Sequence, residues 1–185
     1  KAISPRSIVS SGGFLSWISE NSFFTYNGTV RELKSDVHDF IFDNIQQNTQ
    51  QATFGAHNID YNEIWWFFPV GGTDQLTPNK YIIWNYLDNV WSIGELDRGC
   101  WIDQGVFQNP IACDKDGFVY EHDKRALFNS PGLGTRKPFC TTGPLEIGSG
   151  DRVAQVNQIL PDEETTSLPA ICLLYTSDAA DETGR

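Results

Sequence analysis

The sequence is poor in basic residues and contains no methionine. Its 185 residues include 13 Lys and Arg against 24 Asp and Glu, which gives a formal net charge of −11. A protein that grips nucleic acid through its phosphates needs a basic surface, so this charge excludes a typical electrostatic DNA clamp. No apolar run reaches the roughly 18 residues of a membrane-spanning helix. The first residues also lack the basic and apolar stretches of a secretory signal, and we expect the natural start to lie upstream of Lys1.

Cysteine is scarce as well. The four cysteines form no Cys-x-x-Cys motif, and no pair of histidines stands at metal-binding spacing. We interpret Cys100, Cys113 and Cys140 as three separate thiols, reduced or buried. This pattern favours folding in a reducing cytoplasm.

The C-terminal segment, residues 172–185, differs in character from the rest. It begins CLLYTSDAADE and resembles the translation of a sequencing-library adapter. We therefore predict that it is not native and contributes nothing to the fold. The domain prediction is one domain over residues 1–171, a fragment of a longer protein, followed by this tail.

Aromatic residues, in contrast, are abundant and make up 13% of the chain. They occur in runs where apolar and polar residues alternate, and turn residues separate these runs. Such runs predict short antiparallel strands, and Asn27-Gly28 is a strong hairpin signal. A helix is predicted over residues 36–45. Strands are predicted over residues 14–18, 22–26, 29–33, 52–59, 63–68, 80–86, 90–93, 100–103, 110–114, 118–122, 139–142, 145–147 and 152–160.

The predicted strands recur at intervals of about ten residues, which is typical of all-β proteins. Three stretches, FFTYNGT, YIIWNYLDNVWS and IACDKDGFVYEHD, share the order of an apolar strand, a turn and a second strand. Their separation of about 35 to 60 residues is in the range of four-stranded propeller blades. We predict an all-β fold of antiparallel meanders that is β-propeller-like, a partial propeller, with a β-sandwich as the alternative.

Three carboxylates, Asp60, Glu63 and Asp103, lie beside aromatic strands. A pair of carboxylates about 5 to 9.5 Å apart in an aromatic cleft would suit glycoside hydrolysis. The interpretation that the sequence favours is that they are strand-end or turn residues. The histidines, at positions 38, 57 and 122, form neither a zinc motif nor a Ser-His-Asp set. We therefore predict a protein that is not an enzyme, with no catalytic, metal-binding or cofactor-binding residue.

Asp114-x-Asp116-Gly117 resembles the opening of a calcium loop. Position 12 of such a loop should be Glu, but it is Arg125 here. A solvated hairpin turn is the better interpretation.

Aromatic residues are densest between Tyr61 and Trp101. One interpretation is a sheet buried on both faces, since the neighbouring Trp65 and Trp66 must point to opposite faces of one strand. The other is an exposed platform for sugar rings, formed by Trp65 and Trp66 beside Glu63.

Several segments together resemble the tail-associated structural proteins of tailed phages, most nearly the packaged-DNA stabilisation proteins, or tail nozzles, of podoviruses. The resemblance covers about residues 14–165. It is carried by Trp17 with FFTYNG, EIWWFFP, YIIWNYLDNVWSIGELDRGCWID, GFVYEHD and TGPLEIGSGDRVAQVNQILPDEE.

The resemblance implies a virion protein assembled in the host cytoplasm. It implies a β-propeller subunit that forms a homo-oligomeric ring below the portal and its adaptor, retains the packaged DNA and closes the exit channel. It carries over no catalytic residue and no cofactor, and it implies no membrane partner. Contact with DNA would be transient, through an acidic channel. The alternative function is a glycan-binding or glycan-degrading receptor-recognition propeller.

Overall fold

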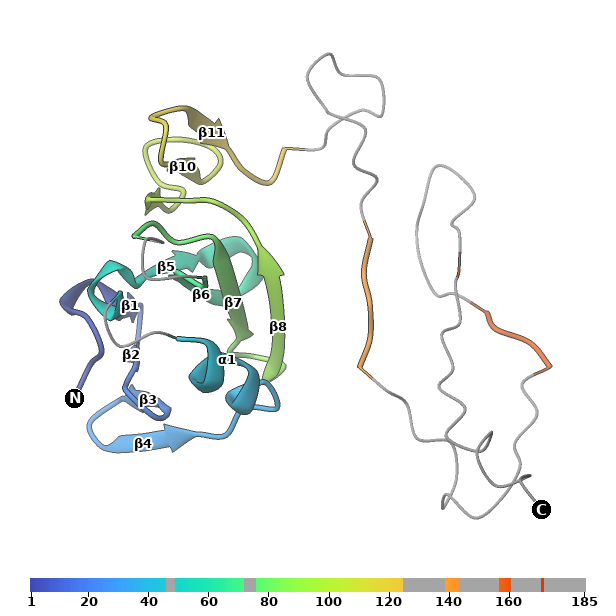
Figure 1. Cartoon of the computed structure of the whole chain (residues 1–185), viewed down its shortest axis with the longest axis horizontal. Helices are drawn as coiled ribbons and strands as arrows, with labels where there is room; N and C mark the ends of the chain where they lie inside the picture. The colour runs from blue at the N-terminus through green and yellow to red at the C-terminus, as the bar shows by residue number, and fades with distance from the viewer. Residues whose placement is uncertain (46–48, 72–75, 125–138, 144–156, 161–170, 172–185) are drawn as a thin grey trace. The chain divides into compact units, whose positions relative to one another are not determined.

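The computed structural model describes residues 1–45, 49–71, 76–124, 139–143, 157–160 and 171 (Figure 1). By its internal contacts the chain divides into two units, residues 1–134 and 135–185. Every helix and strand of the described residues belongs to the first unit.

The described residues of the second unit, 139–143, 157–160 and 171, are in neither helix nor strand. The strand predicted over residues 139–142 is therefore wrong, and the described end of the strand predicted over 152–160 is not a strand either. The strand predicted over 145–147 and the tail at 172–185 lie outside the described residues.

The first sheet consists of four consecutive antiparallel strands, here called sheet 1. They are β1 (Ile8–Ser11), β2 (Phe14–Ile18), β3 (Phe23–Tyr26) and β4 (Val30–Leu33), in that order across the sheet. A 3₁₀ turn, Pro5–Ser7, precedes β1. The predicted Asn27-Gly28 turn joins β3 to β4, and Gly28 has a φ of +104°, a conformation that favours glycine.

A helical connection leads to the second sheet. It contains α1 (His38–Asn44), as predicted, and a 3₁₀ turn, Gln50–Ala52. Sheet 2 is again four consecutive antiparallel strands: β5 (Phe54–Asn58), β6 (Glu63–Phe68), β7 (Lys80–Asn85) and β8 (Val90–Glu95). A third 3₁₀ turn, Ile59–Tyr61, joins β5 to β6.

Sheet 3 has three described strands in the same consecutive order. They are β9 (Cys100–Ile102), β10 (Ile111–Cys113) and β11 (Val119–Glu121). The described part of the chain is thus mostly β, with three antiparallel meanders and one α-helix, as the all-β prediction requires.

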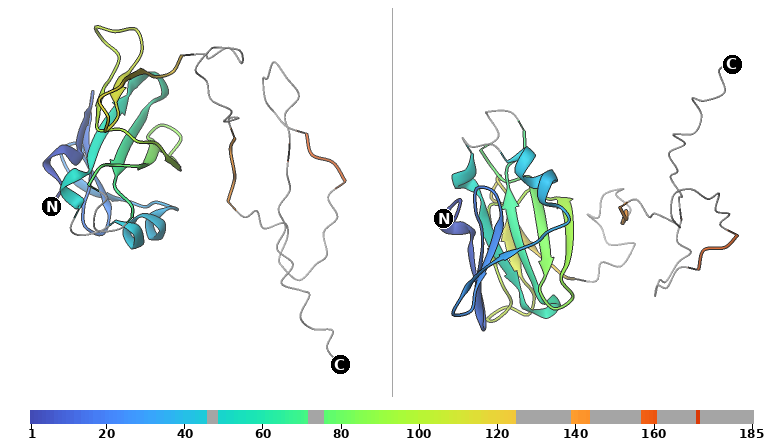
Figure 2. Two further views of the ribbon diagram at one scale, coloured as in Figure 1. Left: turned by 45° about the horizontal axis from the view of Figure 1, so that its top comes forward. Right: turned by 90° about the horizontal axis from the view of Figure 1, so that it is seen from below.

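The sheets stack face to face in chain order (Figures 1 and 2). Their first strands lie next to one another: β5 contacts β1 of the preceding sheet and β9 of the following one. At Gly55 of β5, a Cβ atom would collide with the Val9 side chain of β1 and would lie 3.1 Å from the carbonyl oxygen of Ser7. Glycine at this position therefore permits the close approach of β5 to β1.

Two apolar cores fill the stack. The larger lies between sheets 1 and 2, where Val9, Ile18 and Phe23 meet Ile64 and Trp66. The second lies between sheets 2 and 3 and includes the following residues: Phe54, Ala56, Phe67, Trp65, Tyr81, Leu96 and Trp101. Sheet 2 is consequently buried on both faces, which explains why EIWWFF is continuously apolar after its first residue.

The outer face of sheet 1, turned away from sheet 2, is apolar and open. Cross-strand partners share a face, so the register places Trp17 and Phe24 on this face, and their rings stack at 5.8 Å. The side chains exposed on it include Ile8, Leu15, Tyr26 and Val30.

The outer face of sheet 3 has the same character. Ile102, which is 58% exposed, pairs with Ile111, and Val119, which is 70% exposed, pairs with Cys113. Contiguous exposed apolar patches of this kind are typical of interaction surfaces.

Candidate functional site

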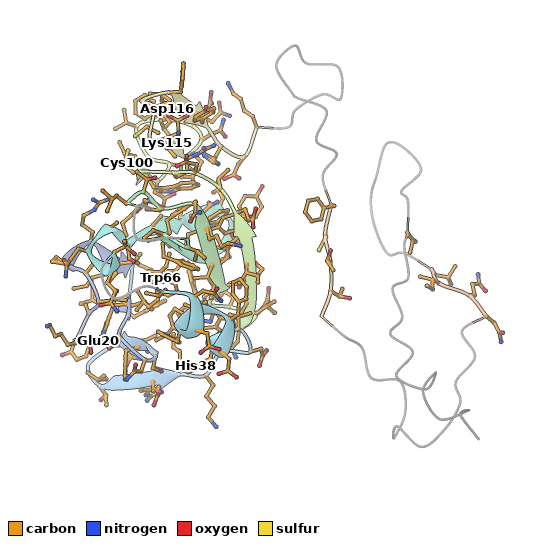
Figure 3. The ribbon with its side chains drawn as sticks, viewed as in Figure 1. Glu20, His38, Trp66, Cys100, Lys115 and Asp116 are labelled. Carbon is orange, nitrogen blue, oxygen red and sulfur yellow. The ribbon has the colours of Figure 1, made fainter. Side chains whose placement is uncertain are left out.

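Trp66 lies inside the stack between sheets 1 and 2, where Figure 3 labels it. Its side chain is fully buried, and its indole Nε1 donates a hydrogen bond of 2.9 Å to the carbonyl oxygen of Ser7. Its ring packs against Phe23 at 5.2 Å and against Trp91 at 6.3 Å. Because no face of the indole reaches solvent, Trp66 offers no stacking surface for a sugar in this chain.

Trp65 points to the opposite side of β6, as the alternation requires. Its ring stacks on Tyr81 at 4.9 Å and on Trp101 of sheet 3 at 5.5 Å. The residue is half-buried, and its contacts join sheet 2 to sheet 3. The two tryptophans therefore belong to two different cores rather than to one platform.

Glu63 begins β6 at the edge of the second core. Its carboxylate accepts a hydrogen bond of 2.8 Å from Trp65 Nε1. Burial raises the pKa of Glu63, the hydrogen bond from Trp65 partly offsets this, and the negative charge of Asp123 raises the pKa further. The carboxylate that acts on Glu63 is thus Asp123, which sequence reasoning did not select.

Asp123 reaches this position from the residues that follow β11. Its Oδ2 accepts a hydrogen bond of 2.9 Å from the amide of Asn58, and Asn58 is only 1% exposed. Asn58 stands directly opposite Glu63 in the register of β5 and β6. Stacking of sheet 3 on sheet 2, not sequence spacing, brings Asp123 here.

Asp103 and His57 form the second polar contact between sheets 2 and 3. Asp103 Oδ2 lies 3.0 Å from His57 Nδ1, and its Oδ1 accepts hydrogen bonds from the backbone N–H groups of Ile59 and Gln104. On the other side of the imidazole, Nε2 lies 3.5 Å from the hydroxyl of Tyr86. Trp101 Nε1 also donates to the carbonyl oxygen of His57, at 3.0 Å.

Asp60 accepts a hydrogen bond from the side-chain amide of Gln104. Gln104 therefore links Asp60 to Asp103, whose Oδ1 accepts from the backbone N–H of the same residue, whereas Glu63 accepts from Trp65. The bonds of Asp60 and Asp103 fasten together the turn that follows β5 and the residues that follow β9.

The other two histidines lie in unlike surroundings. His38, at the start of α1, is close to Asp39 Oδ1 and to the carbonyl oxygen of Asn21, and these two hydrogen bonds raise its pKa. His122 Nε2 accepts a hydrogen bond of 3.0 Å from Arg98 Nε. Burial lowers the pKa of His122, and the positive charge of Arg98 lowers it further.

Asp114 closes the hairpin between β10 and β11, as the turn interpretation predicts. Its Oδ1 accepts hydrogen bonds of 2.9 Å from the backbone N–H groups of Asp116 and Phe118, and its Oδ2 accepts one from the Tyr120 hydroxyl. Both oxygens of the carboxylate are thus engaged, Oδ1 by the turn and Oδ2 by Tyr120 of β11. Among the described residues, no group of three or more His, Cys, Asp or Glu is arranged to hold a metal ion.

Two open hollows indent the surface around sheet 1. One, of about 290 Å³, is lined mainly by polar side chains from the end of β4, the connection that follows it and the start of α1. The other, of about 270 Å³, lies where sheets 1 and 2 meet and is lined by Phe14, Thr25, Asn27, Arg31, Glu32, Leu33, Trp84 and Tyr86. This combination of aromatic rings and polar groups was not anticipated, because it draws on strands of two sheets.

Comparison with known proteins adds no relative. A scan of protein-family models and a search of curated proteins each returned no match for the chain. Within the described residues, no helix combines the length and apolar character needed to cross a bilayer.

Proposed function

We propose that this chain is part of a β-propeller-like structural subunit of a tailed-phage virion, located in the tail nozzle. In this role it would form a closed ring with further copies, below the portal and its adaptor. The ring would retain packaged DNA and later conduct it, without catalysis and without a cofactor. The segments that resemble tail-nozzle proteins, within about residues 14–165, support this role.

The observation that carries the architectural part is the repeated stacking of consecutive meanders. Sheets 1 and 2 have the same strand order, and their first strands are neighbours, as are those of sheets 2 and 3. In a propeller, blades of four consecutive strands stand around a common axis with their faces packed together. The open apolar faces of sheets 1 and 3 are what adjoining blades would cover.

The polar residues support a structural role. Glu63, Asp103 and Asp60 fasten strand ends and loops, and Trp65 and Trp66 fill cores. The net charge of −11 suits a conduit through which DNA must pass without being held, since an acidic wall repels phosphates.

Two measurements test the proposal. The complete reading frame that contains this chain should give ring-shaped particles with a central channel by negative-stain electron microscopy. Binding of duplex DNA should be weak and nearly unchanged between about 50 and 200 mM salt. A monomeric product, or DNA affinity that falls about a thousandfold over that range, would contradict the nozzle role.

Glycan recognition is the second candidate, and the hollow between sheets 1 and 2 favours it. Phe14 and Tyr86, both half-buried, offer rings there, and Arg31 and Asn27 offer hydrogen-bond donors for sugar hydroxyls. A glycan array probed with the wild-type chain and with Arg31→Ala would test whether this hollow binds sugars. Binding that Arg31→Ala abolishes would promote this function over the structural one.

A further inference from the structure

Cys100 and Cys113 stand directly opposite each other on adjacent strands of sheet 3. The register pairs Cys113 of β10 with Cys100 of β9, and the two sulfur atoms lie 2.9 Å apart. The expectation of three separate thiols is therefore wrong for these two. Opposite residues of an antiparallel pair have Cα atoms about 4.5 to 5.5 Å apart, which is within the range that a disulfide bridges.

Both thiols lie on the outer face of sheet 3, away from the core. Trp101, between Cys100 and Ile102, points inward to the second core, so Cys100 points outward. Cys100 is exposed and Cys113 is half-buried, and Figure 3 labels Cys100 at the sheet 3 end of the first unit. A small reagent can thus reach Cys100 without unfolding the sheet.

The site is in its dithiol form here. The hydrogen bond with Cys100 and, to a smaller extent, burial raise the pKa of Cys113 above the usual thiol value. The two sulfurs need to move together by only about 1 Å to reach the bond length of about 2.05 Å.

We propose that Cys100 and Cys113 form a dithiol–disulfide site that is oxidised by low-molecular-weight disulfides such as oxidised glutathione. The Cys100 thiolate attacks a glutathione sulfur, which forms a mixed disulfide and releases one glutathione. The Cys113 thiolate then attacks the Cys100 sulfur, which forms the Cys100–Cys113 bond and releases the second glutathione. Two electrons pass from the protein to the glutathione disulfide, and the two thiol protons end on the two glutathione products.

The assignment of the two roles follows from exposure. Cys100 is the more accessible thiol and receives the incoming reagent, and Cys113 is placed to resolve the mixed disulfide. The bond would tie β9 to β10 across the connection that separates them. The site needs sheet 3 alone and belongs to the chain before assembly, because an adjoining blade of the proposed propeller would cover the face on which both thiols lie.

The test uses the full chain with Cys140→Ser and Cys172→Ser, so that only the two proposed partners remain. After treatment with oxidised glutathione, we expect a mass loss of two hydrogens and no retained glutathione. Digestion with trypsin and chymotrypsin should yield two peptides joined through residues 100 and 113, because cleavage after Trp101 or Phe107 separates them. The oxidised chain should also unfold at a higher urea concentration than the reduced chain.

Two single variants provide the controls. Adding Cys113→Ser should leave one stable glutathione adduct on Cys100, and adding Cys100→Ser should slow the first step. In the two-cysteine chain, disulfide closure should be at least about tenfold faster in buffer than in urea, because the fold holds the thiols together. Two persistent glutathione adducts, or equal closure rates in buffer and urea, would overturn the proposal.

Discussion

The indole of Trp66 and the backbone carbonyl of Ser7 are joined by a hydrogen bond of 2.9 Å that links β6 to the turn before β1. The two residues are 59 positions apart, and both are fully buried. One side chain therefore fills the main core and also fixes how sheet 2 sits on sheet 1.

Replacing Trp66 should test this double role. Trp66→Ala should lower the free energy of unfolding by about 3 to 5 kcal/mol, because it opens a cavity and leaves the Ser7 carbonyl unpaired. Trp66→Phe should lower it less, since a ring remains. Urea unfolding followed by far-UV circular dichroism measures both. Equal stability of Trp66→Ala and the wild type would refute the packing described here.

Asp103 should be more important for stability than its partial exposure suggests. Asp103→Ala removes the acceptor for His57 and for two backbone N–H groups, so we expect a loss of about 1 to 3 kcal/mol. Asp88→Ala, in the exposed turn between β7 and β8, serves as the control and should stay within about 0.5 kcal/mol of the wild type. Thermal unfolding at pH 7 compares the two, and an equal effect would argue against the His57 contact.

His38 and His122 should titrate on opposite sides of 6.5, the usual histidine pKa. The pKa of His38 is raised, so its contribution to stability is fully present below pH 6.5 and is lost as pH rises through its folded pKa. The pKa of His122 is lowered, so folding keeps it neutral and stability declines as pH falls below 6.5. Two-dimensional NMR of the imidazole resonances gives both values, and the reverse order would contradict the surroundings assigned to them.

Glu63→Gln should not destabilise the protein at pH 7. The pKa of Glu63 is raised, so its ionised form opposes folding above its usual value of 4.5, and Gln removes that charge while still accepting from Trp65. Any gain in stability over the wild type should disappear as pH falls below about 4.5, where Glu63 is protonated in both the folded and the unfolded state.

Glu121→Gln is the matched comparison for this substitution. Hydrogen bonds from Lys124 and Asn109 lower the pKa of Glu121, so here the substitution should reduce stability above pH 4.5. Chemical denaturation at pH 4 and pH 7 separates the two cases. If both substitutions changed the free energy of unfolding at pH 7 in the same direction, the opposite pKa shifts of Glu63 and Glu121 would be contradicted.

The strands could be predicted well where local pattern and punctuation coincide. The apolar run Glu63–Phe68 ends at Pro69, and β6 has those bounds. The strand β1 was missed because Ile8–Ser11 has only two apolar residues and two serines. At residues 139–142 an apolar start was not enough to form a strand.

The contacts at the candidate site were harder to predict, because they arise between sheets. Nothing in the spacing of Glu63 and Asp123 indicates that stacking brings their charges together. The Cys100 and Cys113 pair could have been found, since both lie in predicted neighbouring strands. Their register depends on the loop between β9 and β10, which matches no two-residue hairpin turn.

The consecutive strand order also has a consequence for synthesis on the ribosome. Each sheet is complete before the first strand of the next sheet has been made, so most strand pairings are between neighbours in the chain. Such local pairings close short loops and form quickly. The chain can therefore form its β-structure one sheet at a time as it emerges. Each folded sheet then offers an apolar face against which the aromatic strands of the next sheet pack.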